Sequence, residues 1–429
     1  MKQALVLLSL LAAMLASSVA GAAPVFKDED KGIVVNVGVL LQPWFQMTMP
    51  GSNGAGPGAC GTGLRNRCSA GIGNARGDGP AEDFFLRRAR LMIWGSVTKD
   101  LAYFAETDEP NLGKGGNFNT GAGSAFSFIQ DAFLSYTVHP AFKIDVGLFL
   151  MPLSHHTLEG ATSLNALDYH SDEIRFPTGR IFRDTGVQFR GLALQDHLHY
   201  RLAITEGVRN SALVVTTAGA PAPAHSILNP GSVPRFTAQI RGNIMGSEPD
   251  FFFKGIYFSE KPIISVGVGG DWQSEAAFKI NHHHGDYAAL SGDVFVEYPL
   301  TPKDEIIGKL NYFYYAQGNE SITGPVTVNG MTVNSTAAIP GATSVVQGSN
   351  AAYAEVGFRH DFIEPLVFME VFKARKDAQS IIAPHVGVNF WVMKHNFNLK
   401  TDLGYKRTEI KAEPPKKDIL WTTQAQVFF

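Results

Sequence analysis

The stretch Phe397–Lys406 reads FNLKTDLGYK and alternates between two kinds of side chain. Phe, Leu, Thr, Leu and Tyr fill one set of positions, and Asn, Lys, Asp, Gly and Lys fill the other. Lys143–Leu150, which reads KIDVGLFL, also places an aliphatic side chain at every second position. Successive side chains of a β-strand point to opposite faces. Both stretches are therefore predicted to be strands with one apolar face and one charged face, lying between hydrocarbon and water.

This period of two recurs along the chain, and about sixteen strands are predicted. They lie near residues 33–47, 83–97, 101–109, 126–138, 142–152, 184–195, 198–207, 235–245, 263–274, 287–299, 305–317, 351–361, 366–375, 381–392, 396–407 and 418–429. The connections between them alternate in length. The long ones span about 48–82, 110–125, 153–183, 208–234 and 318–350, and the connections 246–262 and 376–380 are the exceptions to the alternation.

An even number of strands, with short turns at one end and long loops at the other, is the plan of an outer-membrane barrel. Every backbone polar group in lipid must be paired within the protein, so only helices or a closed barrel can span a membrane. Beyond the N-terminal leader, no stretch approaches the eighteen consecutive apolar residues of a membrane helix. The predicted fold is therefore all-β, a transmembrane antiparallel β-barrel with short periplasmic turns and long extracellular loops.

Residues 1–22 are typical of a secretory leader. Lys2 supplies a positive start, Leu5–Leu15 is apolar but too short to span a bilayer, and Ala20–Ala22 reads AGA, a cleavage site. We expect a mature chain of residues 23–429 that forms one barrel domain in the outer membrane of a Gram-negative bacterium. An uncleaved anchor is the alternative.

The last strand, Ile419–Phe429, keeps its alternation up to the final residue. A chain that ends on an aromatic residue, here Phe429, resembles the assembly signal of bacterial outer-membrane proteins. This resemblance implies that the barrel assembly machinery recognises the chain. For this pattern taken alone, a soluble β-sandwich whose last strand ends in Phe is the alternative.

Charge and cysteine content exclude several classes of protein. The formal charge is −3, whereas general nucleic-acid binders are normally basic. Two cysteines are too few for a disulfide-rich scaffold, and the chain has no haem-attachment motif. We expect Cys60 and Cys68 to form a disulfide, because the compartment is oxidising.

Motifs for catalysis and metal binding are scarce. The chain contains no G-x-S-x-G elbow, no HExxH and no P-loop. The neighbours Ser154 and His155 are the only residues in the sequence that suggest a catalytic pair, and adjacency in sequence is weak evidence for one. We therefore expect neither an enzyme nor a cofactor. His282–His284 and Asp286 are expected to form a solvated loop rather than a metal site, because consecutive side chains of an extended chain point to alternate sides.

Sixteen strands leave an aqueous channel, whereas eight fill their lumen with side chains. Strand parity assigns ten basic and ten acidic side chains to the lumen, a balance that does not predict strong ion selectivity. The candidates are Arg88, Arg90, Lys143, Arg190, Arg201, Arg241, Lys309, Arg359, Lys400 and Lys406, together with Glu106, Asp108, Asp131, Asp145, Asp271, Asp293, Glu297, Glu355, Glu370 and Asp402.

The connection 153–183 is the best candidate for folding inward and narrowing the pore, because it carries charges of both signs. Across the narrow section we expect the basic residues Arg175, Arg180, Arg183, Arg88 and Arg90 to face the acidic residues Glu159, Asp172 and Glu173. A solvated outer loop is the alternative.

Three short motifs carry a resemblance to a known family. They are Phe85–Arg90 (FLRRAR), Gln130–Phe133 (QDAF) and Val146–Phe149 (VGLF), the last followed by Pro152. With the terminal aromatic residue, they resemble the phosphate-selective porin O and P group of outer-membrane channels. The resemblance implies a sixteen-stranded porin that forms a homotrimer. No basic ladder stands out on the lumen faces, so phosphate selectivity is not carried over.

The sequence thus predicts a water-filled channel for small hydrophilic solutes, anions among them, embedded in outer-membrane lipid. Two alternatives stay open. The barrel could be a scaffold that holds extracellular redox proteins, or it could act in adhesion through its long loops.

Overall fold

The computed structural model describes residues 24–50, 80–114, 129–170, 182–209, 211–217, 224–249, 251–278, 284–318, 325–328, 331–334, 348–374, 379–410 and 414–429. Strands dominate these residues, and the lumen contains one short 3-10 helix, η2 (His156–Leu158). No helix of the described part of the chain is long and apolar enough to cross a membrane.

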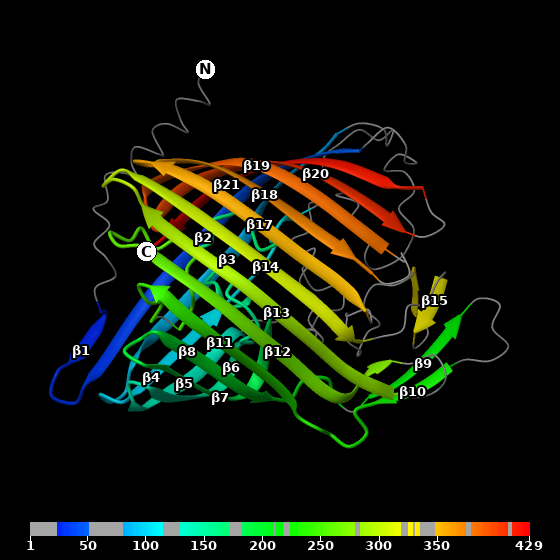
Figure 1. Ribbon diagram of the computed structural model, residues 1–429, viewed down its shortest axis with the longest axis horizontal. Coiled ribbons are helices and arrows are strands. Elements are labelled where there is room, and N and C mark those ends of the chain that lie inside the picture. Colours follow the sequence, from blue (N-terminus) through cyan, green and yellow to red (C-terminus); the bar gives the residue numbers. More distant parts are fainter. Residues whose placement is uncertain are drawn as a thin grey trace.

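Sixteen antiparallel strands form one closed barrel (Figure 1). Each pairs with the next barrel strand along the chain, and every predicted strand overlaps one of them. The barrel strands are β2 (Ile33–Pro50), β3 (Ala81–Ser96), β4 (Leu101–Thr107), β5 (Ile129–His139), β6 (Phe142–Leu150), β7 (Arg183–Ala193), β8 (Leu198–Thr205), β11 (Arg235–Met245), β12 (Ile263–Phe278), β13 (His284–Pro299), β14 (Asp304–Gln317), β17 (Ser349–His360), β18 (Ile363–Lys373), β19 (Gln379–Met393), β20 (Phe397–Ile410) and β21 (Lys416–Phe428). The predicted fold class is confirmed.

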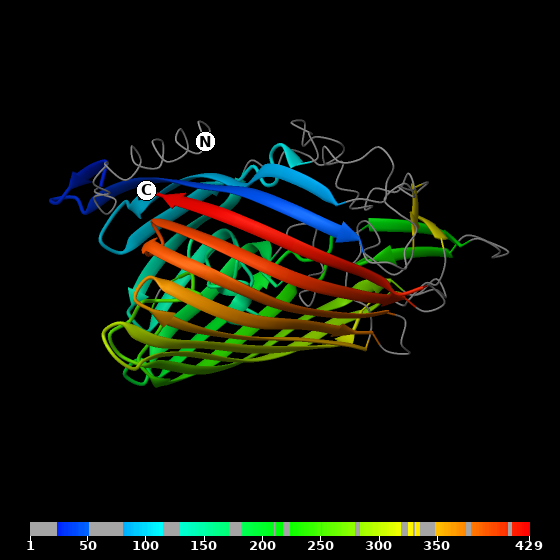
Figure 2. The same ribbon diagram turned by 90° about the horizontal axis from the view of Figure 1, so that it is seen from above.

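The barrel closes where its last strand meets its first. β21 pairs with β2 from Phe428 opposite Leu40 to Asp418 opposite Pro50, and Figure 2 shows the two strands side by side. Val39 and Phe429 exchange two backbone hydrogen bonds, of 2.7 and 3.2 Å. The seam therefore leaves no open sheet edge, as a wall in lipid requires.

The wall is apolar outside and polar inside. Exposed and buried positions alternate along the whole of β18, with Val367 and Met369 facing outward and Glu370 facing inward. On β20, Lys400 is 2% exposed although it is charged, whereas Leu403 is 46% exposed. Exposed apolar and buried charged side chains invert the order of a soluble protein, because lipid covers the outer face.

Two of the long connections contain strands that the sequence analysis did not predict. β9 (Ser211–Thr217) and β10 (Ala224–Leu228) come from one, and β15 (Pro325–Val328) and β16 (Met331–Asn334) from the other. They form a separate four-stranded sheet in the order β10-β9-β15-β16, beyond the long-loop end of the barrel (Figure 1). A further short strand, β1 (Phe26–Asp28), pairs with the start of β2.

A charge on the outer face should destabilise the barrel according to its depth. Val386 is 52% exposed near the middle of β19, whereas Ile363 begins β18 at the short-turn end. We expect Val386→Arg to lower the free energy of unfolding by about 2–4 kcal/mol, and Ile363→Arg by about 0–1 kcal/mol. Denaturant unfolding in lipid vesicles measures both values, and equal losses would contradict the assigned orientation.

Candidate functional site

Two connections fold into the barrel from opposite ends and meet inside it. Residues 151–170, here called the lumen loop, follow β6 at the long-loop end. Residues 246–249 and 251–262, the short-end segment, join β11 to β12 at the other end. Phe253 N donates to Leu158 O, and Gly160 N donates to Phe253 O, both at 2.9 Å. Part of the lumen cross-section is therefore filled by the chain itself.

Charged side chains of alternating sign follow the lumen loop from one wall of the barrel to the other and are here called the charge chain. Its members, in order, are Arg241, Glu248, His155, Glu159, Lys309, Glu355, His170 and Glu370. All are buried. A buried charge is costly unless it is paired and hydrogen-bonded, so the alternation is what allows so many charges in this space.

The first half of the charge chain runs from β11 to the lumen loop. Arg241 Nη2 lies 3.3 Å from Glu248 Oε2. His155 contacts Glu248 through Nε2 at 2.7 Å and Glu159 through Nδ1 at 3.0 Å. Burial lowers the pKa of His155, but Glu248 and Glu159 raise it further, to above its usual value. The two carboxylates therefore favour the charged form of the imidazole.

The second half runs from the lumen loop to β18. Lys309 Nζ on β14 lies 3.3 Å from both oxygens of Glu159 and 3.4 Å from Glu355. His170 contacts Glu355 at 3.0 Å and Glu370 at 3.3 Å. Burial lowers the pKa of His170, but its hydrogen bonds to the two carboxylates raise it to about 9. His170 is therefore a cation at neutral pH.

The loop also binds the arginines of β3. Arg87 Nε donates to Asp168 Oδ2 at 2.8 Å, and Arg88 Nη2 donates to Asp168 Oδ1 at 2.5 Å. Strict alternation would point Arg87 outward, but Leu86 pairs with Pro43 and Arg88 with Gln42, so Arg87 is the extra residue of a β-bulge. Burial raises the pKa of Asp168, and the two guanidiniums lower it well below its usual range.

A second cluster joins five of the predicted pore residues on the walls of β3, β4, β5 and β7. Arg90 contacts Glu106 at 2.9 Å and Asp108 at 2.8 Å. Arg183 contacts Asp131 at 2.8 Å and Glu106 at 3.5 Å. The sequence analysis expected Arg90 and Arg183 to face Glu159, Asp172 and Glu173. The described contacts of both arginines are with carboxylates of the wall and not with Glu159, while Asp172 and Glu173 lie outside the described residues. Neighbouring strands offer these partners at closer range than Glu159.

Arg190 and Arg241 lie on the wall near the short-turn end. Arg190 Nε donates to Asp145 Oδ2 at 2.7 Å, and Arg241 donates to Asp293 on β13. Rings of the short-end segment cover both guanidiniums, with Phe251 4.9 Å from Arg190 and Phe253 5.2 Å from Arg241. The packing of aromatic rings over arginine is favourable, above all where water is excluded.

Several predicted residues lie outside the described part of the chain. They are Asp172, Glu173, Arg175, Arg180, Cys60, Cys68, His282 and His283, together with the leader, residues 1–22. Arg87 and Glu248 were missed by the sequence analysis. Arg87 was missed because strict alternation assigns it to the outer face, and the β-bulge is not visible in the sequence. Glu248 was missed because it lies in a connection between two strands.

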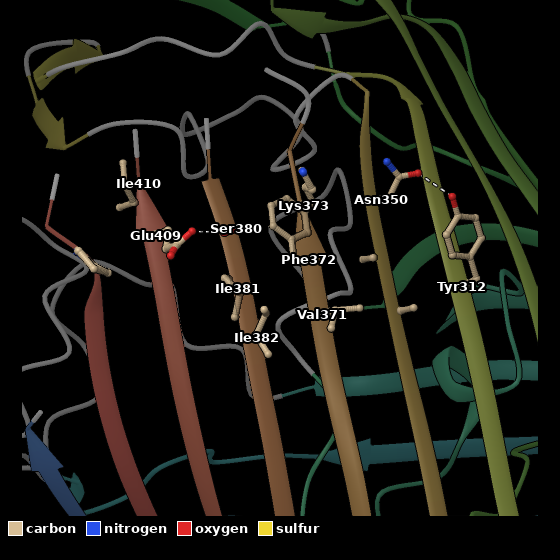
Figure 3. A pocket seen from close by; sticks show the side chains of 13 residues that line it. Tyr312, Asn350, Val371, Phe372, Lys373, Ser380, Ile381, Ile382, Glu409 and Ile410 are labelled. Carbon is tan, nitrogen blue, oxygen red and sulfur yellow. Dashed lines mark hydrogen bonds between the residues drawn. The ribbon is translucent and has the colours of Figure 1, made fainter. Parts of the chain in front are cut away.

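A cavity of about 740 Å³ lies elsewhere, at the long-loop ends of β14 and β17–β20 (Figure 3). Its side chains Tyr312, Val371 and Ile382 are exposed and belong to the outward-facing set. Its polar groups pair locally, as where Tyr312 donates to Asn350 at 2.6 Å. Its lining also includes the buried, inward-facing side chains of Ala351, Phe372 and Ile381, so it lies at the rim of the wall and contains no residue of the charge chain.

A closed sixteen-stranded barrel with an apolar outer face, a charged lumen and a connection folded into that lumen is the architecture of outer-membrane porins. Residues 63–240 match the family model described as phosphate-selective porin O and P. All three motifs that carried the resemblance lie in this range, so the resemblance is confirmed there. The match covers the N-terminal part of the barrel, and the architecture of the described chain is that of outer-membrane channels.

Solved structures of outer-membrane channels share the fold. The outer membrane channel DcaP of Acinetobacter baumannii is 12% identical, with 95% of this chain and 100% of that chain covered and a TM-score of 0.51. OmpF of Salmonella typhi, in a complex with daunomycin, is 10% identical, with coverages of 94% and 100% and a TM-score of 0.51. No curated protein matches the sequence. Identities this low support the architecture alone.

In a conducting lumen, the Asp168 carboxylate should lower the permeability to anions relative to cations. It is 24% exposed and shared by two arginines. One unit charge about 5 Å from an ion's path changes the ion's energy by about 0.8 kcal/mol in water, or about fourfold in local concentration. Asp168→Asn should raise the local chloride concentration and lower the local potassium concentration by up to this factor each, so we expect the chloride-to-potassium permeability ratio to rise by up to about sixteenfold.

Reversal potentials in a KCl gradient measure the ratio. Asp100→Asn, which makes the same charge change in an exposed short turn, is the control. An unchanged ratio in Asp168→Asn would show that the conducting path lies away from this carboxylate.

Proposed function

We propose that the protein is a porin with a narrow passage, in which the lumen loop determines which solutes pass. The alternating charge chain that crosses the lumen carries this proposal. The pore-lining side chains that we assign to the passage are Arg88, Arg90, Glu106, Asp108, Asp131, Glu159, Arg183, Arg190 and Arg241, with Asp172, Glu173, Arg175 and Arg180 in the same long connection.

Further hydrogen bonds support a loop that is held rigidly across the channel. Lys400 Nζ on β20 donates to the carbonyl oxygens of Leu164, Asn165 and Ala166, at 2.6, 3.3 and 3.1 Å. Gln426 on β21 donates to Thr162 O at 2.8 Å. These anchors lie on strands far from β11 and β14, so the loop is held from several sides and acts as a fixed constriction.

The occupied lumen favours a channel over a scaffold. A barrel that holds a folded redox partner needs an open cross-section, and here the described lumen contains the protein's own lumen loop and short-end segment.

The contacts of Ser154 and His155 disfavour catalysis as well. Both imidazole nitrogens of His155 contact carboxylates, and Ser154 Oγ accepts a hydrogen bond from Thr157 N at 3.2 Å. Among the described residues, no histidine or carboxylate hydrogen-bonds to Ser154 Oγ.

Three further features complete the proposal. The chain is exported through the leader of residues 1–22, it forms a homotrimer as the family resemblance implies, and Cys60 and Cys68 are bridged. A mass shift on alkylation of the intact protein tests the bridge, and cross-linking in detergent tests the trimer. Discrete current steps in planar bilayers test the channel itself, and silence at several voltages would contradict it.

Breaking the charge chain at its centre should loosen the constriction. Lys309→Met leaves Glu159 and Glu355 buried without their shared cation. Removing one partner of a buried ion pair lowers the stability by about 3–5 kcal/mol. We expect a larger and noisier single-channel conductance. The double variant Glu159→Gln/Lys309→Met removes both charges and should return close to the native current. A Lys309→Met channel with native conductance would contradict the role of the loop.

The same constriction should depend on pH through His170. Its pKa is about 9 in the folded protein and 6.5 in the unfolded chain, so its stabilising charge is fully present below pH 6.5 and is lost as the pH rises through about 9. We expect current noise to increase between pH 7 and pH 10. In His170→Gln the increase in current noise with pH should be absent. Current noise of the native protein that does not change between pH 7 and pH 10 would contradict a role of His170 in holding the constriction.

A further inference from the structure

The two sides of the lumen differ in how far their side chains reach water. On β12, β13 and β14, inward-facing residues such as Gln273, Phe295 and Asn311 are fully buried. Near the opposite wall, half-buried side chains face the lumen from β4 and β6 and from the short-end segment. The accessible space therefore includes the short-turn part of the β4–β6 wall, where Phe104 and Lys143 are half-buried, and the lining of this space is what a solute meets.

Aromatic rings form part of that lining. Phe104 on β4 and Phe133 on β5 stack with centroids 5.6 Å apart. Phe251 stacks on Phe133 at 4.2 Å, and the edge of Phe252 meets Phe104 at 5.0 Å. Phe104, Phe251 and Phe252 are each half-buried, so this cluster keeps aromatic surface open to the lumen.

Cations adjoin the rings. Phe251 lies 4.9 Å from the guanidinium of Arg190, and Arg190 is the direct cross-strand partner of Lys143. Like charges in directly opposite positions repel. Asp145 is engaged by Arg190 at 2.7 Å and by Gln188 at 2.8 Å. Lys143 is half-buried and makes no hydrogen bond or ion pair with any described residue.

We infer that Phe104, Phe251, Phe252, Lys143 and Arg190 form a binding surface for organic anions that carry an aromatic ring. An inorganic anion would use the cations alone, and a neutral aromatic solute would use the rings alone. An aromatic carboxylate stacks its ring on the cluster while its charge meets Lys143. This inference rests on the proposed channel function and names the solute class that the channel favours.

The test compares three solutes in single-channel recordings of the native protein in KCl. Benzoate has a ring and a charge, acetate has the charge alone, and benzyl alcohol has the ring alone. We expect benzoate to interrupt the current in a concentration-dependent manner, and the other two to have little effect at the same concentrations.

Two pairs of variants locate the site. Phe252→Leu and Lys143→Gln should each raise the half-blocking concentration of benzoate about fivefold, a loss typical of one aromatic or charge contact. Phe84→Leu, an outward-facing aromatic residue, and Lys99→Gln, in an exposed turn, are the matched controls and should leave the value unchanged.

The possible results distinguish a failure of the binding surface from a failure of the channel function. Equal effects of the three solutes, or a half-blocking concentration that neither lumen variant moves, would overturn the inference while KCl currents still support the channel. The absence of any current from folded, heat-modifiable native protein would instead overturn the proposed function.

Discussion

Every backbone N–H and C=O group inside hydrocarbon needs a partner within the protein, because lipid offers none. The architecture follows from this requirement. Sixteen strands pair neighbour to neighbour, and the seam between β21 and β2 pairs the last edge with the first. Once the sheet is closed, its two faces have different solvents. Apolar side chains on the outer face cost nothing in lipid, and polar side chains are left to fill the cylinder.

The filled cylinder sets the second constraint. Charges removed from water must be paired closely, and the lumen meets this demand with alternating signs along the lumen loop and with arginine–carboxylate clusters on the walls. The same contacts that satisfy the charges also hold the loop in place. Stability and restriction of the passage therefore arise from one set of interactions, so changes to these residues will affect both.

The pairing of Arg183 illustrates what local patterns leave out. Its sign and its inward direction follow from the sequence, and an acidic partner could be expected. Glu159 lies in the same long connection and was one of three expected partners. Among the described residues Arg183 instead pairs with Asp131 and Glu106 on β5 and β4, while Glu159 pairs with Lys309 on β14. Residues adjacent in a connection can reach opposite walls, because the loop crosses the lumen.

The sequence by itself determined the sixteen strands, their inward and outward faces, and the alternation of long and short connections, since side-chain alternation is a local property of extended chain. The tertiary structure alone decided that residues 246–262 enter the lumen, that the bulge at Arg87 turns a second arginine toward Asp168, and that two long connections share a sheet. These features depend on which segments meet after closure, and no local period of the sequence encodes such distances.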